Sequence, residues 1–214
     1  MNCVDAFVIL DSVQFAKRSY TNRCPIESPN AEPAWLTVPV LSGGRYHQAI
    51  GDVEVNGDDW REPLCERMRH RWGSLLFGKD LVARAADIVR NSGPRLGDLN
   101  LNLIELVRDT LGITTPLHFE SQFGLAADID PTERIVHLTK ALGGAVYVSG
   151  KGGAAYLNHD LTSAAGIDVV VASFAVAPTD ELAVRFGDKS CFELLSRTGG
   201  DDCRARLGST HIAT

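Results

Sequence analysis

The chain has 214 residues, of which 44% are hydrophobic and 22% charged, and its formal net charge is −6. This composition is typical of a soluble globular protein, and the acidic balance argues against a broadly cationic nucleic-acid binder. No apolar run approaches the roughly 20 residues that span a bilayer, and no signal-peptide pattern follows Met1, so we expect a cytoplasmic protein without membrane contact. The five cysteines are scattered without CxxC spacing, which favours neither a disulfide framework nor a cysteine metal site.

The first predicted element is a buried strand over residues 4–10, which ends at Asp11. The dozen residues that follow contain the polar groups Gln14, Lys17, Arg18, Asn22 and Arg23. Ligands of open α/β folds bind just past the carboxyl ends of strands. Asp11 is therefore a candidate general base or orienting group, and the cations are candidates for holding a phosphate or carboxylate. The alternative is a structural loop of salt bridges.

The rest of the chain alternates strands and helices. Strands are predicted over residues 35–40, 50–55, 145–149 and 167–174, and helices over 60–72, 79–92, from an Asp98 cap to Gly112, and from an Asp130 cap to Gly143. This order favours an α/β fold with a mixed or mostly parallel open sheet flanked by helices. We expect a single domain over residues 1–199 and a flexible tail over residues 200–214.

A glycine-rich turn, SGKGGAAY, follows the predicted strand that ends at Ser149. Its glycines would let backbone N–H groups approach an anion closely, whereas the alternative is a flexible tight turn. It matches neither a P-loop nor a dinucleotide-binding fingerprint. The candidate binding residues in this turn are Ser149, Gly150, Lys151, Gly152, Gly153 and Tyr156.

Two further residues are candidates for chemistry. Cys24 adjoins Arg23, which would favour its thiolate, although a lone cysteine is more often a packed residue. His159 follows the glycine turn and is a candidate acid or base. The six histidines lack HxxxH or HxH spacing, so we predict no metal site and no cofactor.

The helix predicted over residues 60–72 places Trp60, Leu64, Met68 and Trp72 on one stripe. Its other faces carry the basic residues Arg61, Arg67, Arg69, His70 and Arg71. A solvated helix face is the preferred interpretation, and a patch for phosphate or polynucleotide is the alternative.

Several of these segments together resemble the WbqC-like proteins. The segments are FVILDSVQFAKRSYTNR, WLTVPV, IGDVEV, the DLN and LGITTP pieces, YVSGKGGAAYL and GIDV, and the resemblance covers about residues 4–199. It implies a biosynthetic role in bacterial surface-polysaccharide or secondary-metabolite pathways. The family pattern picks out Asp11, Gln14, Phe15, Lys17, Arg18, Asn22, Arg23, Trp35, Thr37, Pro39, Asn100, Ser149, Gly150, Gly153 and Tyr156.

The resemblance implies an enzyme that moves an activated acyl or aminoacyl group, such as glycyl, to a small polar acceptor such as an amino sugar nucleotide or a natural-product intermediate. The expected partner is an anionic or phosphorylated small molecule. Two alternatives stay open: a non-catalytic or degenerate protein that binds an anionic ligand, and an aminoacyl-tRNA-dependent enzyme. The family pattern also has a preceding strand with a His-Gln-Pro segment, which this sequence lacks before Val4, so we expect an incomplete site.

Overall fold

The computed structural model describes residues 1–28, 34–174, 179–207 and 210–213. The chain divides into two compact units, and each is described by itself. The first unit combines residues 1–13, 114–175 and 209–214, whereas the second combines residues 14–113 and 176–208. Each unit therefore assembles segments that lie far apart in the sequence.

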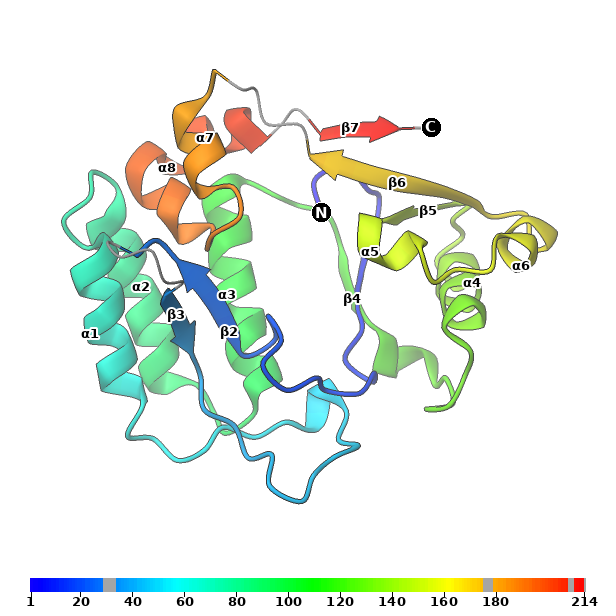
Figure 1. Ribbon diagram of the computed structural model, residues 1–214, viewed down its shortest axis with the longest axis horizontal. Helices are drawn as coiled ribbons and strands as arrows, with labels where there is room; N and C mark the ends of the chain where they lie inside the picture. Colours follow the sequence, from blue (N-terminus) through cyan, green and yellow to red (C-terminus); the bar gives the residue numbers. More distant parts are fainter. Residues whose placement is uncertain (29–33, 175–178, 208–209, 214) are drawn as a thin grey trace. The chain divides into compact units, whose positions relative to one another are not determined.

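The first unit alternates short strands and helices (Figure 1). Its elements are β1 (Phe7–Ile9), β4 (Leu117–Phe119), the 3-10 helix η2 (Glu120–Phe123), α4 (Pro131–Ala141), β5 (Val146–Ser149), α5 (Lys151–Ala154), α6 (His159–Ala164), β6 (Asp168–Phe174) and β7 (Thr210–Ala213). Strands β1 and β4 pair in parallel, and β6 lies between the parallel strand β5 and the antiparallel strand β7. The apolar run predicted as a strand over residues 167–174 is therefore confirmed, and β6 is the central strand of this group.

Strand β1 is shorter and less buried than the sequence predicts. It covers three residues in place of residues 4–10, and all three are half-buried. Among the described residues β1 pairs with β4 alone, so its other edge carries no strand. The expectation of a fully buried first strand is therefore wrong, although Asp11 still follows the carboxyl end of a parallel pair.

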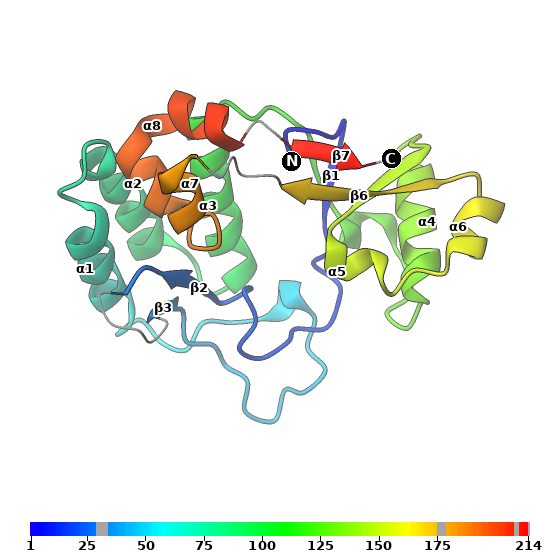
Figure 2. The same cartoon turned by 45° about the horizontal axis from the view of Figure 1, so that its top comes forward.

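The second unit is mainly helical. Its elements are β2 (Arg23–Ile26), β3 (Ala34–Thr37), the 3-10 helix η1 (Ile50–Asp52), α1 (Arg61–Trp72), α2 (Gly78–Asn91), α3 (Leu96–Leu111), α7 (Glu181–Phe186) and α8 (Phe192–Leu207). Helices α1, α2 and α3 lie side by side in both views, and α8 packs against all three (Figures 1 and 2). Strands β2 and β3 form an antiparallel pair. Both units thus confirm the mixed α/β class, with the described strands paired in three small groups.

The helix patterns of the second unit are largely confirmed. Leu64, Met68 and Trp72 are buried on one stripe of α1, whereas Trp60 just before the helix is half-buried. Helix α3 begins one turn earlier than predicted, with Arg95 at the cap position and Asp98 in the first turn, where its charge suits the helix dipole.

Two local predictions of this unit need correction. The alternating segment predicted as a strand over residues 50–55 begins as η1. Val53 and Val55 are buried as a strand pattern requires, but their backbone groups form hydrogen bonds with the start of α3 and the turn before it. The N–H of Val55 donates to the carbonyl of Pro94, and the N–H of Leu96 donates to the carbonyl of Val53.

The stretch from residue 200, predicted as a flexible tail, is helical as far as Leu207, and residues 210–213 form β7 in the first unit.

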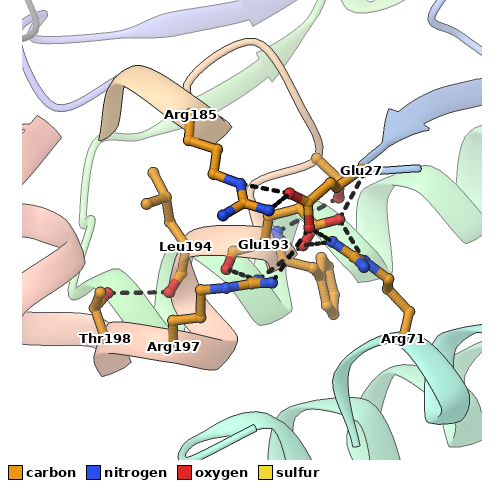
Figure 3. A network of polar contacts seen from close by, with 9 residues as sticks. Glu27, Arg71, Arg185, Glu193, Leu194, Arg197 and Thr198 are labelled. Carbon is orange, nitrogen blue, oxygen red and sulfur yellow. Dashed lines mark hydrogen bonds and ion pairs between the residues drawn. The ribbon is translucent and has the colours of Figure 1, made fainter. Parts of the chain in front are cut away.

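A network of five charged side chains ties the second unit together (Figure 3). Glu193 on α8 has a fully buried side chain. Its two carboxylate oxygens accept hydrogen bonds from Arg71 Nε at 2.8 Å and Nη2 at 3.0 Å, and from Arg197 Nη1 at 2.8 Å. Glu27, just past β2, also pairs with Arg71 and with Arg185 on α7. The network therefore joins the end of β2 to α1, α7 and α8.

Burial and hydrogen bonding act in opposite directions on the two carboxyl groups. Burial raises the pKa of Glu193, but the bonds from Arg71 and from the Glu27 backbone N–H outweigh it and leave that pKa below its ordinary value. The pKa of Glu27 is likewise lowered, since hydrogen bonds from Arg71 and Arg185 outweigh its burial. A carboxyl group whose pKa is lower in the folded state stabilises the fold above its unfolded pKa, and this contribution is lost as the pH falls through the folded pKa.

Replacing Glu193 by Gln is expected to lower the free energy of unfolding by about 3 kcal/mol at pH 7, because it removes a fully buried carboxylate from the half-buried guanidiniums of Arg71 and Arg197. Urea denaturation measures this change. The matched control is Glu62→Gln, which breaks an exposed pair with Arg90 and should have a much smaller effect. The difference between wild type and Glu193→Gln should shrink below about pH 4.3, the ordinary pKa of glutamate. A difference that persists undiminished at pH 3 would contradict the assigned role of the carboxylate.

Candidate functional site

In the first unit, Asp11 is held at the carboxyl end of the β1–β4 pair. Ile9 is opposite Phe119 in the parallel register, so the same register two residues further sets Asp11 opposite Ser121. The backbone N–H of Ser121 donates to Asp11 Oδ1 at 2.9 Å, and its hydroxyl donates to Oδ2 at 2.6 Å. Asp11 is half-buried and Ser121 exposed. Each carboxylate oxygen thus accepts one bond and keeps a further lone pair for a ligand.

The residue before Ser121 forms a buried ion pair that joins η2 to α4. Glu120 is fully buried and pairs with the buried Arg134 of α4. Arg134 also donates to the carbonyl of Ala127 at 3.3 Å. Because Glu120 directly precedes Ser121, the ion pair determines where the Ser121 donors point. Ser121 is not among the residues predicted from the sequence, and its position just past the second strand of a parallel pair becomes apparent only from the strand register.

The glycine turn has a tight local structure. Ser149 is buried, and its hydroxyl donates to the carbonyl of Gly150 at 3.0 Å. A Cβ atom at Gly153 would lie 2.7 Å from Ser149 Oγ, so a larger residue there would force the buried Ser149 hydroxyl to move. Helix α5 after the turn has only four residues, too few for a strong helix dipole at its N-terminus. These contacts explain the turn in terms of packing, and anion binding by it stays a prediction.

Three of the other predicted residues of the first unit face solvent, whereas the side chain of Lys151 lies outside the part that the structure describes. Gly152 and Tyr156 are exposed, Tyr156 by 84%. His159 is exposed at the first position of α6, after the Asn158 cap. No hydrogen bond among the described residues joins Asp11 to the glycine turn or to His159. Their cooperation therefore stays a prediction. An open hollow of about 630 Å³ along α4 is lined by none of the predicted site residues.

In the second unit, the loop over residues 14–23 is anchored by carboxamides. Gln14 Nε2 donates to the carbonyl of Tyr46 at 2.7 Å, and Asn22 Nδ2 donates to that of Val38 at 2.9 Å. Asn100 on α3 donates to the carbonyl of Thr21 at 2.8 Å. Gln14, Asn22 and Asn100 thus position backbone, which gives three residues of the family pattern a structural role.

The three cations of this loop are held without carboxylates. The Lys17 ammonium lies 5.0 Å from the ring centroid of Tyr46, and the Arg23 guanidinium lies 4.2 Å from that of Trp35. Arg18 is exposed and has φ of 58°, a left-handed conformation that is costly for a side chain with a Cβ. Among the described residues none of the three forms an ion pair, and Arg23 Nε is buried without an acceptor.

The basic face of α1 is different, because its arginines are used within the unit. Arg61 donates to the carbonyl of Val89, Arg67 to that of Trp35, and Arg69 pairs with Glu66. Arg71 belongs to the five-residue network and is half-buried. The prediction of a simply solvated face is therefore incomplete, and the alternative of a phosphate patch has few uncommitted guanidiniums to support it.

Cys24 lies in β2 and is half-buried. Burial raises the pKa of its thiol, although a hydrogen bond with Ser190 opposes that effect. The thiolate fraction at neutral pH is therefore reduced, which argues against a nucleophilic role. Among the residues that the structure describes, no group of three or more His, Cys, Asp or Glu side chains has the geometry for a metal ion. No helix in those same ranges is long and apolar enough to cross a membrane.

The chain belongs to the WbqC-like protein family, whose family model matches residues 1–181. This confirms the family resemblance. Among curated proteins it is similar to the uncharacterized protein Rv1507c of Mycobacterium tuberculosis (strain ATCC 25618 / H37Rv). The two are 31% identical over 164 residues, which cover 73% of this chain and 67% of that protein. No solved structure matches the chain.

Exchanging Arg18 for Gly or for Ala separates backbone strain from charge. Both variants remove the guanidinium, but only glycine adopts the left-handed conformation freely. We expect Arg18→Gly to be more stable than Arg18→Ala by about 1 kcal/mol in urea denaturation, while both lose anion affinity equally. Equal stability of the two variants would show that residue 18 is not left-handed in solution.

Proposed function

We propose that the protein is a transferase that moves an activated acyl or aminoacyl group, such as glycyl, to the amine of a small acceptor. One substrate is anionic, and Lys17, Arg18 and Arg23 bind its charged groups. The observation that carries the proposal is that these three cations lie on an anchored loop without a carboxylate partner among the described residues. Lys17 and Arg23 contact aromatic rings, and Arg18 has a left-handed backbone conformation.

This arrangement favours anion binding for a physical reason. Four guanidinium groups elsewhere in the same unit, those of Arg69, Arg71, Arg90 and Arg197, are paired with the carboxylates of Glu66, Glu193 and Glu62. A cation without such a partner has donors left for a phosphate or carboxylate, and charge-assisted bonds of this kind are the stronger ones. The overall charge of −6 makes a local site of this type more selective, because the rest of the surface repels anions.

Asp11 would act on the acceptor amine. In the proposed reaction the amine nitrogen attacks the acyl carbon and the C–N bond forms. The bond from that carbon to its leaving group breaks, the leaving group departs with the bonding electrons, and the Asp11 carboxylate accepts the proton that the nitrogen loses. Asp11 orients the amine and stabilises the positive charge that grows on the nitrogen, while the Ser121 donors keep its carboxylate in place. An oxyanion formed at the acyl carbon needs preorganised donors, for which the backbone N–H groups at residues 150–153 stay candidates.

The two alternative functions make different predictions. A non-catalytic binding protein would keep the anion affinity of the loop and give no product. An enzyme that uses aminoacyl-tRNA would show affinity that falls steeply with salt, because phosphate contacts release counterions. The second alternative has little support, because four arginines of α1 already form hydrogen bonds or ion pairs within the second unit: Arg61, Arg67, Arg69 and Arg71.

The test is transfer, followed by mass spectrometry, from acyl and aminoacyl adenylates or thioesters to amino sugar nucleotides. Asp11→Asn is expected to lower turnover at least about 100-fold, the usual contribution of a positioned acid or base. Ser121→Ala should lower it less, because the carboxylate loses one hydroxyl donor and keeps the backbone donor.

Ser163→Ala, which removes an exposed hydroxyl of α6, is the matched control and should leave turnover unchanged. Full activity in Asp11→Asn would contradict the assigned role of the carboxylate. Binding of an anionic ligand without product from any donor would favour the non-catalytic alternative.

A further inference from the structure

Exposed aromatic rings accompany the cations of the 14–23 loop. Tyr20 is 76% exposed and Tyr46 is 68% exposed. Large amphipathic rings that stay in solvent on an anchored loop need an explanation, since burying such a ring is favourable. Both rings lie in the immediate surroundings of the unpaired cations, Tyr46 under Lys17 and Tyr20 beside the Trp35 ring that Arg23 covers.

Tyr20, Trp35 and Arg23 form a contiguous group, which we call the aromatic platform. The Tyr20 and Trp35 rings are 5.9 Å apart between centroids and tilted by 47°, and the Arg23 guanidinium lies 4.2 Å from the Trp35 centroid. Trp35 is half-buried, whereas Tyr20 is 76% exposed. The platform therefore presents one tyrosine ring to solvent, and a guanidinium lies against the ring next to it.

The platform is preorganised by the backbone around it. Arg23 and Trp35 belong to the paired strands β2 and β3, in which Pro25 is opposite Trp35. On the other side of Tyr20, the hydroxyl of Ser19 donates to Thr21 Oγ1 at 3.0 Å, and Asn100 holds the carbonyl of Thr21. Tyrosine has only two side-chain torsions to order, so a ligand that stacks on it incurs a low entropy cost.

The geometry points to a nucleoside phosphate as the ligand, with its base stacked on Tyr20 and its phosphates at Arg18 and Arg23. This inference rests on the proposed function, since it names the class of the anionic substrate at the same loop. An exposed aromatic face binds any base by stacking, and guanidinium groups bind phosphate oxygens.

Other ligand classes use only part of this arrangement. Inorganic phosphate has no ring to stack on Tyr20, and a neutral sugar has no charge to pair with the cations. A polynucleotide would need a longer basic surface than the loop provides, because the arginines of α1 are already bonded within the unit. A mononucleotide or nucleoside diphosphate uses both the ring and the charges.

The experiment is isothermal titration calorimetry of the full chain with UDP, ADP and inorganic pyrophosphate. Wild type is expected to bind both nucleotides more tightly than pyrophosphate. Tyr20→Leu, which keeps an apolar contact with Trp35 and lacks a π face, should weaken nucleotide binding by about 5- to 150-fold, the range for loss of one stacked base. Pyrophosphate affinity should not change in this variant, and Tyr20→Phe should restore nucleotide binding.

Two controls keep the outcomes separate. Phe77→Leu removes the π face of another exposed ring of the second unit and should leave nucleotide affinity unchanged. Arg18→Ala should weaken the binding of nucleotides and of pyrophosphate together. Arg84→Ala, which removes an exposed arginine of α2, should weaken neither.

If pyrophosphate binds as tightly as the nucleotides and Tyr20→Leu has no effect, the platform inference is overturned while the anion site of the proposed function stands. If neither nucleotides nor pyrophosphate bind, both are overturned.

Discussion

The buried carboxylate of Glu193 is the constraint on which the second unit depends. An ionised group with a fully buried side chain is tolerated only when several donors surround it. Those donors come from α1, from α8 itself and from the backbone after β2, where the N–H of Glu27 donates to Glu193 at 2.9 Å. Because the requirement involves every one of these elements, none of them can shift without exposing a charge to an apolar environment.

The position of the loop cations follows from that constraint. The network holds the end of β2, and β2 holds β3 through an antiparallel register in which Arg23 is opposite Thr37. The side chains of Arg23 and Trp35 stack across this pair. The same unit therefore uses its positive charge in two ways. Around Glu193 guanidiniums neutralise carboxylates and stabilise the fold, whereas in the 14–23 loop aromatic rings contact Lys17 and Arg23, and no carboxylate of the described residues pairs with either.

Local signals in the sequence predict much of the fold. The i+4 stripe of α1 and the Asp130 cap of α4, which accepts from Thr132 N and Glu133 N, are confirmed because they depend on neighbours along the chain. Contacts between distant residues are not visible in this way. Arg71 and Glu193 are 122 residues apart, so the sequence offers a solvated helix face where the structure has a buried ion pair. The segment over residues 50–55 shows a related limit, since burial of alternate residues does not require a continuous strand: the segment begins as η1 and then forms isolated bridges, Val55 with Val40 and Glu54 with Arg95.

In the candidate site of the first unit, the strand register determines which residue lies beside Asp11, and the amino-acid sequence alone does not. Asp11 is conspicuous in the sequence because it ends an apolar run, whereas Ser121 lies in a connection with no motif. A parallel register with Ile9 opposite Phe119 sets residues 11 and 121 opposite each other, with side chains on one face. Two donors from a single residue then orient the carboxylate, and the buried Glu120–Arg134 pair keeps that residue from turning away. A carboxylate oriented by the strand register needs no reorganisation when an amine arrives, and for a group-transfer site that preorganisation is the main contribution a single aspartate makes.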